Sequence, residues 1–302
     1  MPTELEAVVI VGDASQERAF AAPLSIGVVD AAEIRTAGPM VNLSESLDRV
    51  PGVVANLRNN YAQDLQLSVR GFGARSTFGI RGVRLYADGI PATMPDGQGQ
   101  VSHFDLASAQ RIEVLRGPFS ALYGSNSGGV VSLVGAPATE SAITLGGDVG
   151  SDGLWQARLG VEAPLPGGWN LRLLASRFNT DGVRPHSAAT RSLANLRLGW
   201  NGAQDAVTLV ANHVDQPAQD PLGLTREQFD TDPFQTTPQA IEFDTRKTSA
   251  QSQVGARWRH AFIDAGALVE SSVAVYAGQR AVTQWQAIPA VAQGRPSHPG
   301  GV

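Results

Sequence analysis

The carboxy-terminal half of the chain alternates apolar and polar residues with a period of two. From residue 141 onward this pattern recurs in seven segments, which predicts seven β-strands. The segments are residues 141–150, 154–164, 168–179, 190–201, 205–215, 246–260 and 266–280. In 246–260, one face carries Thr248, Ala250, Val254, Ala256 and Trp258, and the other carries Lys247, Gln251, Gln253, Arg257 and Arg259. Because repeated charges suit a polar lumen better than a dry core, the pattern predicts antiparallel barrel strands between lipid and water.

The connections between these segments alternate in length. Turns at 164–168, 201–205 and 262–264 are short, whereas 181–190 and 216–245 are long. Trp169, Trp200 and Trp258 all lie beside short turns, which predicts one aromatic belt at a membrane interface. The alternative is a soluble two-sheet sandwich, in which the apolar faces pack together and the polar faces are exposed.

The amino-terminal part is built differently, from short β-prone runs separated by glycine. The candidate strands are residues 5–12, 24–29, 53–57, 67–71, 83–89, 111–116 and 129–134. One helix is expected over 42–50, where Leu43 and Leu47 lie one turn apart and Pro51-Gly52 ends it. These elements predict a compact α/β domain ahead of the barrel strands.

Composition narrows the function classes. The 302 residues include 33 glycines and 18 prolines, only 17% are charged, and the mean hydropathy is −0.09, which is typical of a turn-rich β protein. No stretch approaches the ~20 consecutive apolar residues of a membrane-spanning helix. The absence of cysteine excludes disulfides, zinc thiolates and cysteine nucleophiles. The net charge of −5 is opposite to that of a nucleic-acid-binding surface, so no nucleic-acid partner is expected.

Six glycine-rich motifs follow one another between Ser68 and Val131. They are SVRGFG (68–73), GIRGV (79–83), YADGIP (86–91), PDGQ (95–98), RIEVLRGP (111–118) and LYGSNSGGVV (122–131). In order and spacing they resemble the plug domain of TonB-dependent outer-membrane receptors. The resemblance implies an α/β plug, a short mixed sheet with small helices, followed by an antiparallel transmembrane β-barrel. We expect an N-terminal segment at 1–22, the plug at 23–136 and the first, incomplete part of the barrel, about seven strands, at 137–302.

The resemblance also implies a function. Such receptors import a scarce nutrient, most often a ferric siderophore or another iron complex, across the outer membrane of Gram-negative bacteria. The implied partners are TonB with its inner-membrane energising complex, the iron ligand and outer-membrane lipid; a monomeric barrel without a cofactor is expected. The first residues lack the pattern of a secretory signal, so we expect that signal to have been removed or to lie outside this sequence. The alternative is a fragment, or truncated gene product, that binds or signals only, because about seven strands cannot close around a plug when plugged transporters use ~22.

The segment 5–11 lies where these receptors carry their TonB box, the strand that pairs with TonB. The candidate residues are Glu6, Ala7, Val8, Val9, Ile10 and Val11. A mobile, β-prone terminus is suited to pairing as an added strand. The alternative is an ordinary strand of the plug.

Two arginines match the plug residues that pair with barrel glutamates in the family. They are Arg70 and Arg116, whose planar guanidinium groups can grip carboxylates at two points. The matching glutamates lie on later strands than those present here. Glu162 and Glu270 are possible local partners, and the alternative for either arginine is a solvated strand residue, which the repeated arginine-glycine corner disfavours.

The loops 75–78 and 94–100 resemble the outward-facing plug apices that touch substrate. The contact candidates are Arg75, Phe78, Gln98, Gln100 and His103, with plain surface turns as the alternative. The five histidines are scattered and predict no metal site; Asp230 and Asp232 are either calcium ligands or hydrated loop residues. The motifs GSNSG and GFGARS do not fit a nucleophile elbow or a dinucleotide fingerprint, so no enzyme is expected.

Overall fold

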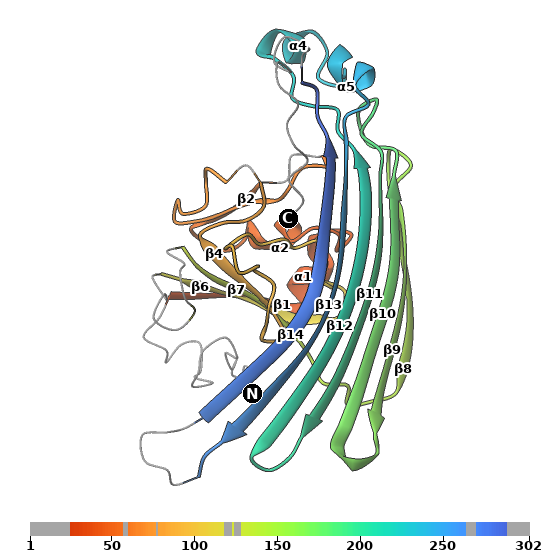
Figure 1. The fold of residues 1–302 in the computed structure, drawn as a ribbon. Coiled ribbons are helices and arrows are strands. Elements are labelled where there is room, and N and C mark those ends of the chain that lie inside the picture. The colour runs from red at the N-terminus through yellow and green to blue at the C-terminus, as the bar shows by residue number, and fades with distance from the viewer. Residues whose placement is uncertain are drawn as a thin grey trace, which may run out of the picture.

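The computed structural model describes residues 25–56, 60–76, 78–117, 123, 128–263 and 270–288. They form a small α/β domain against the concave face of a large curved sheet (Figure 1). We call residues 25–135 the plug and the sheet of β8–β14 the wall. The expected strand at 5–12 lies outside the described residues.

The plug contains a mixed five-stranded sheet in the order β1-β6-β7-β4-β5. Its strands are β1 (Ser25–Asp30), β4 (Val83–Ala87), β5 (Ile90–Pro91), β6 (Ala109–Arg116) and β7 (Gly129–Gly135). β2 (Val53–Asn56) and β3 (Gln66–Val69) form a separate antiparallel pair. Within the sheet, only β4 and β7 pair in parallel. The expected mixed sheet is therefore confirmed.

Two short helices cover this sheet. α1 (Ala31–Ala37) begins with a capping box, because Glu33 N donates to Asp30 Oδ1 at 2.8 Å and Asp30 N donates to Glu33 Oε2 at 3.0 Å. α2 (Ser44–Leu47) lies inside the predicted helix 42–50 but is shorter, since a turn at residues 48–52 ends it. The main plug core includes Ile34, Leu47 and Phe104, all nearly fully buried.

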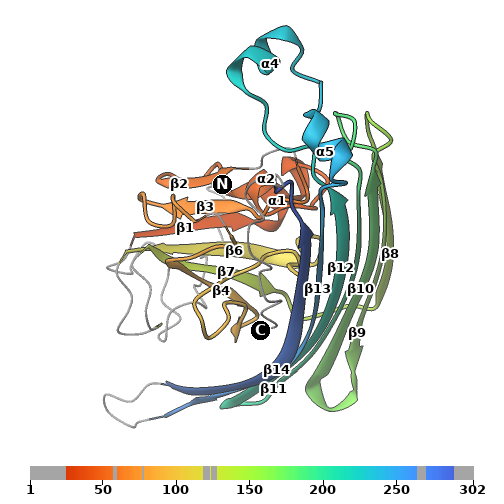
Figure 2. The same ribbon diagram turned by 45° about the horizontal axis from the view of Figure 1, so that its top comes forward.

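The wall is an antiparallel meander of seven consecutive strands. They are β8 (Ala142–Val149), β9 (Trp155–Leu165), β10 (Trp169–Thr180), β11 (Ala189–Asn201), β12 (Asp205–Gln219), β13 (Arg246–Ala261) and β14 (Glu270–Trp285). All seven predicted strands are present, with ends that differ by a few residues. The sheet curves around one side of the plug without closing (Figure 2).

The two ends of the wall differ. One end carries the connections 181–188 and 220–245, the latter with α4 (Arg226–Thr231) and α5 (Pro238–Glu242), and we call it the loop end (Figure 1). The other, the turn end, carries the short connections 166–168 and 202–204. The helices α4 and α5 were not expected from the sequence, and β12 runs farther than predicted, to Gln219.

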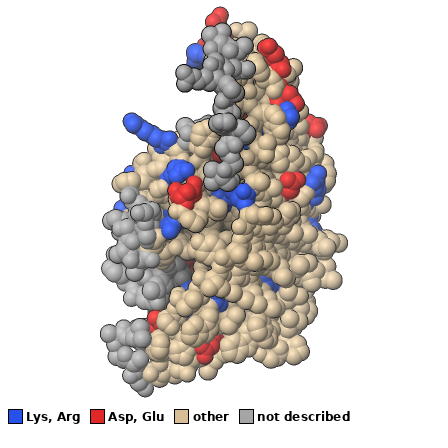
Figure 3. All heavy atoms as spheres, in the orientation of Figure 1, with Lys and Arg blue, Asp and Glu red and all other residues tan. Residues whose placement is uncertain are grey.

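The two faces of the wall differ as the alternation predicts. On β13, Lys247 and Gln251 are only 6% and 7% exposed toward the plug, whereas Val254 and Trp258 on the opposite face are 57% and 44% exposed. The outer surface seen in Figure 3 is mostly uncharged over the strands. Among the described residues, no helix has the length and apolar character needed to cross a membrane.

The three tryptophans beside short turns lie in one row. Strand register pairs Trp169 with Trp200, Trp200 with Val207, and Val207 with Trp258. The rings of Trp169 and Trp200 are 6.4 Å apart, and the row crosses four neighbouring strands at the turn end. This is the arrangement of an interfacial aromatic belt.

Candidate functional site

The contacts between plug and wall, which we call the seam, are made largely by wall side chains and plug main chain. Arg191 of β11 is 3% exposed and inserts into the plug. Its Nη1 donates to the carbonyl of Val41 at 2.9 Å, and its Nη2 donates to those of Ser102 at 2.6 Å and Phe104 at 3.0 Å. Its Nε also donates to Ser102 O at 2.9 Å. One guanidinium thus uses its planar fork to bind three carbonyl groups in two plug segments.

Other wall strands repeat this pattern. Arg172 of β10 donates to Ser108 O at 2.6 Å, and Gln253 of β13 donates to Pro91 O at 2.9 Å. Three further donors reach plug carbonyls: Arg158 to Pro39 at 3.3 Å, Gln216 to Tyr61 at 3.0 Å and Arg280 to Ala92 at 3.4 Å. The donors alternate along the strands with lipid-facing residues, so the seam uses the polar face that the sequence predicted.

A buried ion pair lies in the seam near the loop end. Lys247 of β13 pairs with Asp64, and their side chains are 6% and 10% exposed. The same carboxylate accepts hydrogen bonds from Gln100 Nε2 at 2.9 Å and from the backbone amide of Gly79 at 2.7 Å. Asp64 therefore connects the wall with the two plug loops that were expected to contact substrate.

A second carboxylate fixes the plug from the loop end itself. Asp220 follows β12 and accepts hydrogen bonds from Asn60 Nδ2 at 2.6 Å and Gln63 Nε2 at 2.5 Å. Beside them Ala62 packs with Ala189 and Ala218, and the ring of Tyr61 lies 5.0 Å from that of Phe178. This small apolar cluster is the main hydrophobic contact across the seam among the described residues.

Buried carboxylates of the plug lie around the guanidinium of Arg191. Glu45 accepts the backbone amides of Met40 and Asn42, each at 2.7 Å, and burial raises its pKa while these bonds and Arg191 oppose the rise. Burial also raises the pKa of Asp105, which is held by Ser108. Arg191 thus provides positive charge where two desolvated carboxyl groups need it.

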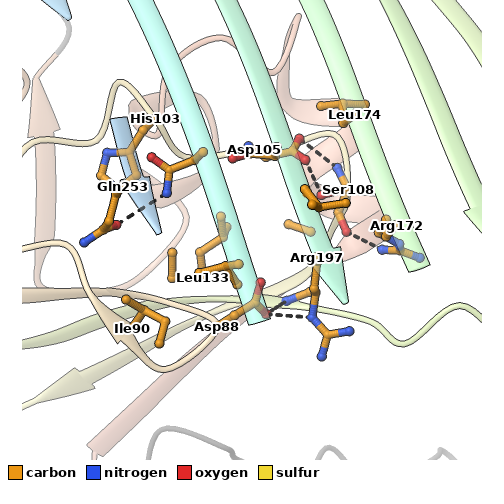
Figure 4. A pocket seen from close by; sticks show the side chains of 17 residues that line it. Asp88, Ile90, His103, Asp105, Ser108, Leu133, Arg172, Leu174, Arg197 and Gln253 are labelled. Atoms are coloured by element: carbon orange, nitrogen blue, oxygen red, sulfur yellow. Dashed lines mark hydrogen bonds and ion pairs between the residues drawn. The ribbon is translucent and has the colours of Figure 1, made fainter. Parts of the chain in front are cut away.

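A small cavity of about 50 Å³ separates plug and wall beside His103 (Figure 4). Its lining combines apolar side chains such as Leu133 and Leu174 with polar ones, among them Asp88, Asp105 and Gln253. His103 is 2% exposed, and neither ring nitrogen has a hydrogen-bond partner among the described residues. Burial, with help from Arg280 and Arg191, lowers the pKa of His103 to about 3, so the ring is neutral at pH 7.

The predicted substrate-contact residues divide into two groups. Arg75, Phe78 and Gln98 lie at the plug surface; Phe78 is 55% exposed, and Gln98 Nε2 donates to its carbonyl at 3.3 Å, so the two loops form one patch. Gln100 and His103 were expected at an apex, but the structure places both inside the seam. Gln100 is bonded there to Asp64 of the plug, whereas His103 is buried without a hydrogen-bond partner among the described residues.

The predicted lock residues lie together at the start of β1. Arg70 is exposed and donates to Ser25 Oγ at 3.1 Å, and Arg116 is the register partner of Ser25 and donates to the carbonyl of Pro51. Neither contacts a described wall glutamate. Glu162 pairs with Arg172 at 2.9 Å and Glu270 with Arg259 at 3.6 Å, so these glutamates already have other partners. The lock remains a prediction.

Two predictions remain, the TonB box and the calcium ligands. The TonB-box candidates, residues 6–11, lie outside the described residues. Asp230 pairs with Arg226 at 2.8 Å, and Asp232 accepts the amide of Phe234 at 2.9 Å. Within the described ranges, no group of three or more His, Asp or Glu residues could hold a metal ion. The calcium interpretation therefore gains no support.

Sequence reasoning missed the seam donors. The only sequence signal for these donors is their place on the polar face of the predicted strands. They are Arg158, Arg172, Arg191, Lys247 and Arg280. Their acceptors are mostly backbone carbonyls, which leave no mark in a sequence. The sequence therefore indicated which side chains face inward and not what they bind.

Comparison with known proteins gives consistent results. The family model described as "TonB-dependent Receptor Plug Domain" matches residues 18–131. The ferric enterobactin receptor PirA of Pseudomonas aeruginosa is 33% identical over 143 residues, which cover 42% of this chain and 18% of that protein. This relative is a receptor, not an enzyme.

Solved structures agree on the fold. The unliganded ferric citrate transporter FecA matches with a TM-score of 0.73 and 21% identity, covering 93% of this chain and 43% of that one. The ferric yersiniabactin uptake receptor FyuA of Yersinia pestis matches at 0.69 and 19%, covering 86% and 41%. The chain thus spans less than half the length of each protein compared. Residues 18–131 therefore match the plug domain of TonB-dependent receptors, and the plug and the wall together share the fold of these solved receptors over less than half of their length.

Proposed function

We propose that the complete receptor binds an iron complex at the loop end and imports it across the outer membrane of a Gram-negative bacterium, with energy delivered by TonB. The observation that carries the proposal is the way the plug is held. Its main core draws every described member from the plug itself, whereas the seam is mostly hydrogen bonds. Such a plug can shift as a unit without unpacking its core. PirA, FecA and FyuA are each named for a ferric ligand, which favours iron as the cargo.

The ligand would first meet the exposed patch of Arg75, Phe78 and Gln98. An arginine beside an exposed aromatic ring suits an anionic chelate with flat ligand groups, because the guanidinium can pair with oxygen atoms while the ring covers apolar surface. Gly79, next to Phe78, donates its amide to Asp64, which also holds Lys247. Movement of the patch would therefore act directly on a seam contact.

TonB would pull on residues 6–11, added as a strand to its own sheet. Tension would reach β1 first among the described elements. Among the described strands, β1 lies at the edge of the plug sheet and pairs with β6 alone, and Arg70 and Arg116 both lie at its start. We propose that pulling peels this edge strand and releases the arginines from barrel glutamates on later strands. The barrel acts as a monomer in contact with lipid, and no covalent chemistry is required.

The test uses the complete receptor in a host that lacks its own iron-chelate receptors. Growth on a panel of ferric siderophores, ferric citrate and haem identifies the cargo, and labelled cargo measures surface binding and uptake separately. Deletion of residues 6–11 should abolish uptake and leave surface binding and outer-membrane abundance unchanged. If the intact receptor binds a ferric complex but never imports it, the binding-only alternative is favoured. If the deletion prevents assembly, residues 6–11 form a structural strand.

A further inference from the structure

A second, larger cavity lies between the plug and the turn end of the wall, opposite the exposed patch. Its volume is about 560 Å³, which falls within the range of small-molecule sites. Tyr86, Asp88 and Gly89 line it from the plug, and Arg197, Arg257 and Arg259 line it from the wall. The wall strands extend past the plug sheet at this end (Figure 2).

The charges in this cavity are unequally matched. Arg259 pairs with Glu270 at 3.6 Å, and Arg197 pairs with Asp88 at 3.5 Å. Arg257 forms no direct hydrogen bond or ion pair with any residue that the structure describes, and the carboxylates of Glu270 and Asp88 act on it only electrostatically, from beyond ion-pair distance. A half-buried guanidinium without a bound carboxylate retains most of its capacity to bind an anion.

The plug backbone at Gly89 leaves room for this guanidinium to lie against it. A Cβ added at Gly89, whose φ is +78°, would lie 2.7 Å from Arg257 Cδ and Nη1. Glycine therefore both permits the left-handed turn and allows the arginine to lie flat against the main chain. Next to it, the rings of Tyr86 and Tyr123 meet edge to face with centroids 5.6 Å apart and give the cavity an aromatic wall.

We propose that this cavity is an inward-side binding site for the anionic iron chelate, with Arg257 as the residue that pairs with its carboxylate or catecholate oxygen atoms. The inference rests on the proposed function and adds a second binding site to the path of the chelate. An anion leaving the loop end would find at the turn end an unpaired cation and an aromatic surface. The site would hold the chelate after the plug has moved and before it leaves the barrel.

The test separates this site from surface binding. In the complete receptor, Arg257→Gln should leave surface binding of the imported ferric complex unchanged and lower its uptake rate by about tenfold, the effect of removing one charge-assisted hydrogen bond. Arg257→Lys, which keeps the charge, should retain most of the rate. Arg177→Gln is the matched control, because Arg177 lies on the outer face of β10 and bonds to Ser192. Equal uptake by the Arg257→Gln variant and the wild type would overturn the inference.

A direct titration makes the result independent of transport. The 302-residue chain in detergent is titrated with ferric citrate by calorimetry, in wild-type form and as Arg257→Gln. We expect the variant to bind at least about tenfold more weakly, and wild-type binding to weaken between low and high salt. Identical binding by both forms would reject the site. If the complete receptor imports no ferric complex, the proposed function fails, while this titration still decides whether the cavity binds the anion.

Discussion

Replacing Arg191 tests whether the seam holds the plug as the hydrogen bonds indicate. Arg191→Leu keeps an apolar side chain of moderate size at the same place and removes every hydrogen bond to the carbonyls of Val41, Ser102 and Phe104. It also removes the positive charge next to Glu45 and Asp105, so the pKa of both carboxyl groups should rise further. The plug should then separate locally from the wall in a larger fraction of molecules.

The magnitude follows from the carbonyl groups that Arg191 satisfies. Three buried carbonyl oxygens would be left without a charged donor, at a cost of about 1–3 kcal/mol each. Removing the buried guanidinium recovers part of its desolvation cost, which is several kcal/mol. The net decrease in stability should be about 3–5 kcal/mol, the value typical of removing one partner from a buried charged network. Each 1.4 kcal/mol is about tenfold in an equilibrium constant, so opening should rise by roughly two to four orders of magnitude.

Amide hydrogen exchange in detergent measures this opening directly. The Phe104 amide donates to Val101 O at 3.0 Å and the Gly99 amide to Ile80 O at 2.7 Å, so both report on the plug beside the seam. Exchange of the Phe104 and Gly99 amides should be faster in Arg191→Leu than in the wild type, and faster by a smaller factor in Arg191→Lys. It should be unchanged in Arg177→Leu, because Arg177 lies on the outer face. Exchange at Phe104 within about threefold of wild type would refute the view that Arg191 fastens the plug.

Two further predictions concern buried charge in the plug. Lys247→Met should lower the free energy of unfolding by about 3–5 kcal/mol, because it leaves Asp64 buried without its cation. Urea unfolding measures this decrease, and adding Asp64→Asn should recover part of it. An equal or larger decrease in the double variant would contradict the pairing. The pKa of His103 is about 3 in the folded chain and 6.5 in the unfolded chain. Between pH 3 and pH 6.5 the unfolded chain therefore binds one more proton than the folded chain. The free energy of unfolding falls as the pH falls through this range, by up to ~1.4 kcal/mol per pH unit. His103→Gln should flatten that slope, and an unchanged slope would show that His103 does not carry it.

The wall was the part of the fold most readable from sequence. Barrel strands alternate strictly, because one face meets lipid and the other meets a polar lumen. The seven segments, the two connection lengths and the tryptophan row were therefore all predictable. The longer plug strands were predicted from the glycines that separate them, but the two-residue β5 and the plug's first helix were not. α1 was missed although Asp30 and Glu33 form a capping box, because seven residues give too little periodicity to recognise.

The candidate site was predicted only in part. Arg75, Phe78 and Gln98 lie in the exposed patch, but Gln100 and His103 are buried although both are polar. Both face the wall instead of solvent, Gln100 bonded to Asp64 of the plug and His103 without a hydrogen-bond partner among the described residues, and no local pattern shows which polar residues the wall covers. Contacts such as that of Arg191 with Val41 join residues 150 positions apart through a backbone oxygen, which no local pattern encodes.

The seam has a consequence for exchange of parts between receptors. Its wall donors reach carbonyl groups at Pro39, Val41, Ser102 and Ser108, and every amino acid carries that group. Side chains at these positions can therefore change while the fit persists, provided that the loop path is kept. A foreign plug of the same backbone should seat in this wall, whereas a foreign wall that lacks the equivalent of Arg191 should not retain this plug. Grafting would thus be governed by loop geometry, a few wall arginines and the plug side chains that bond to the wall, Asp64, Asn60 and Gln63.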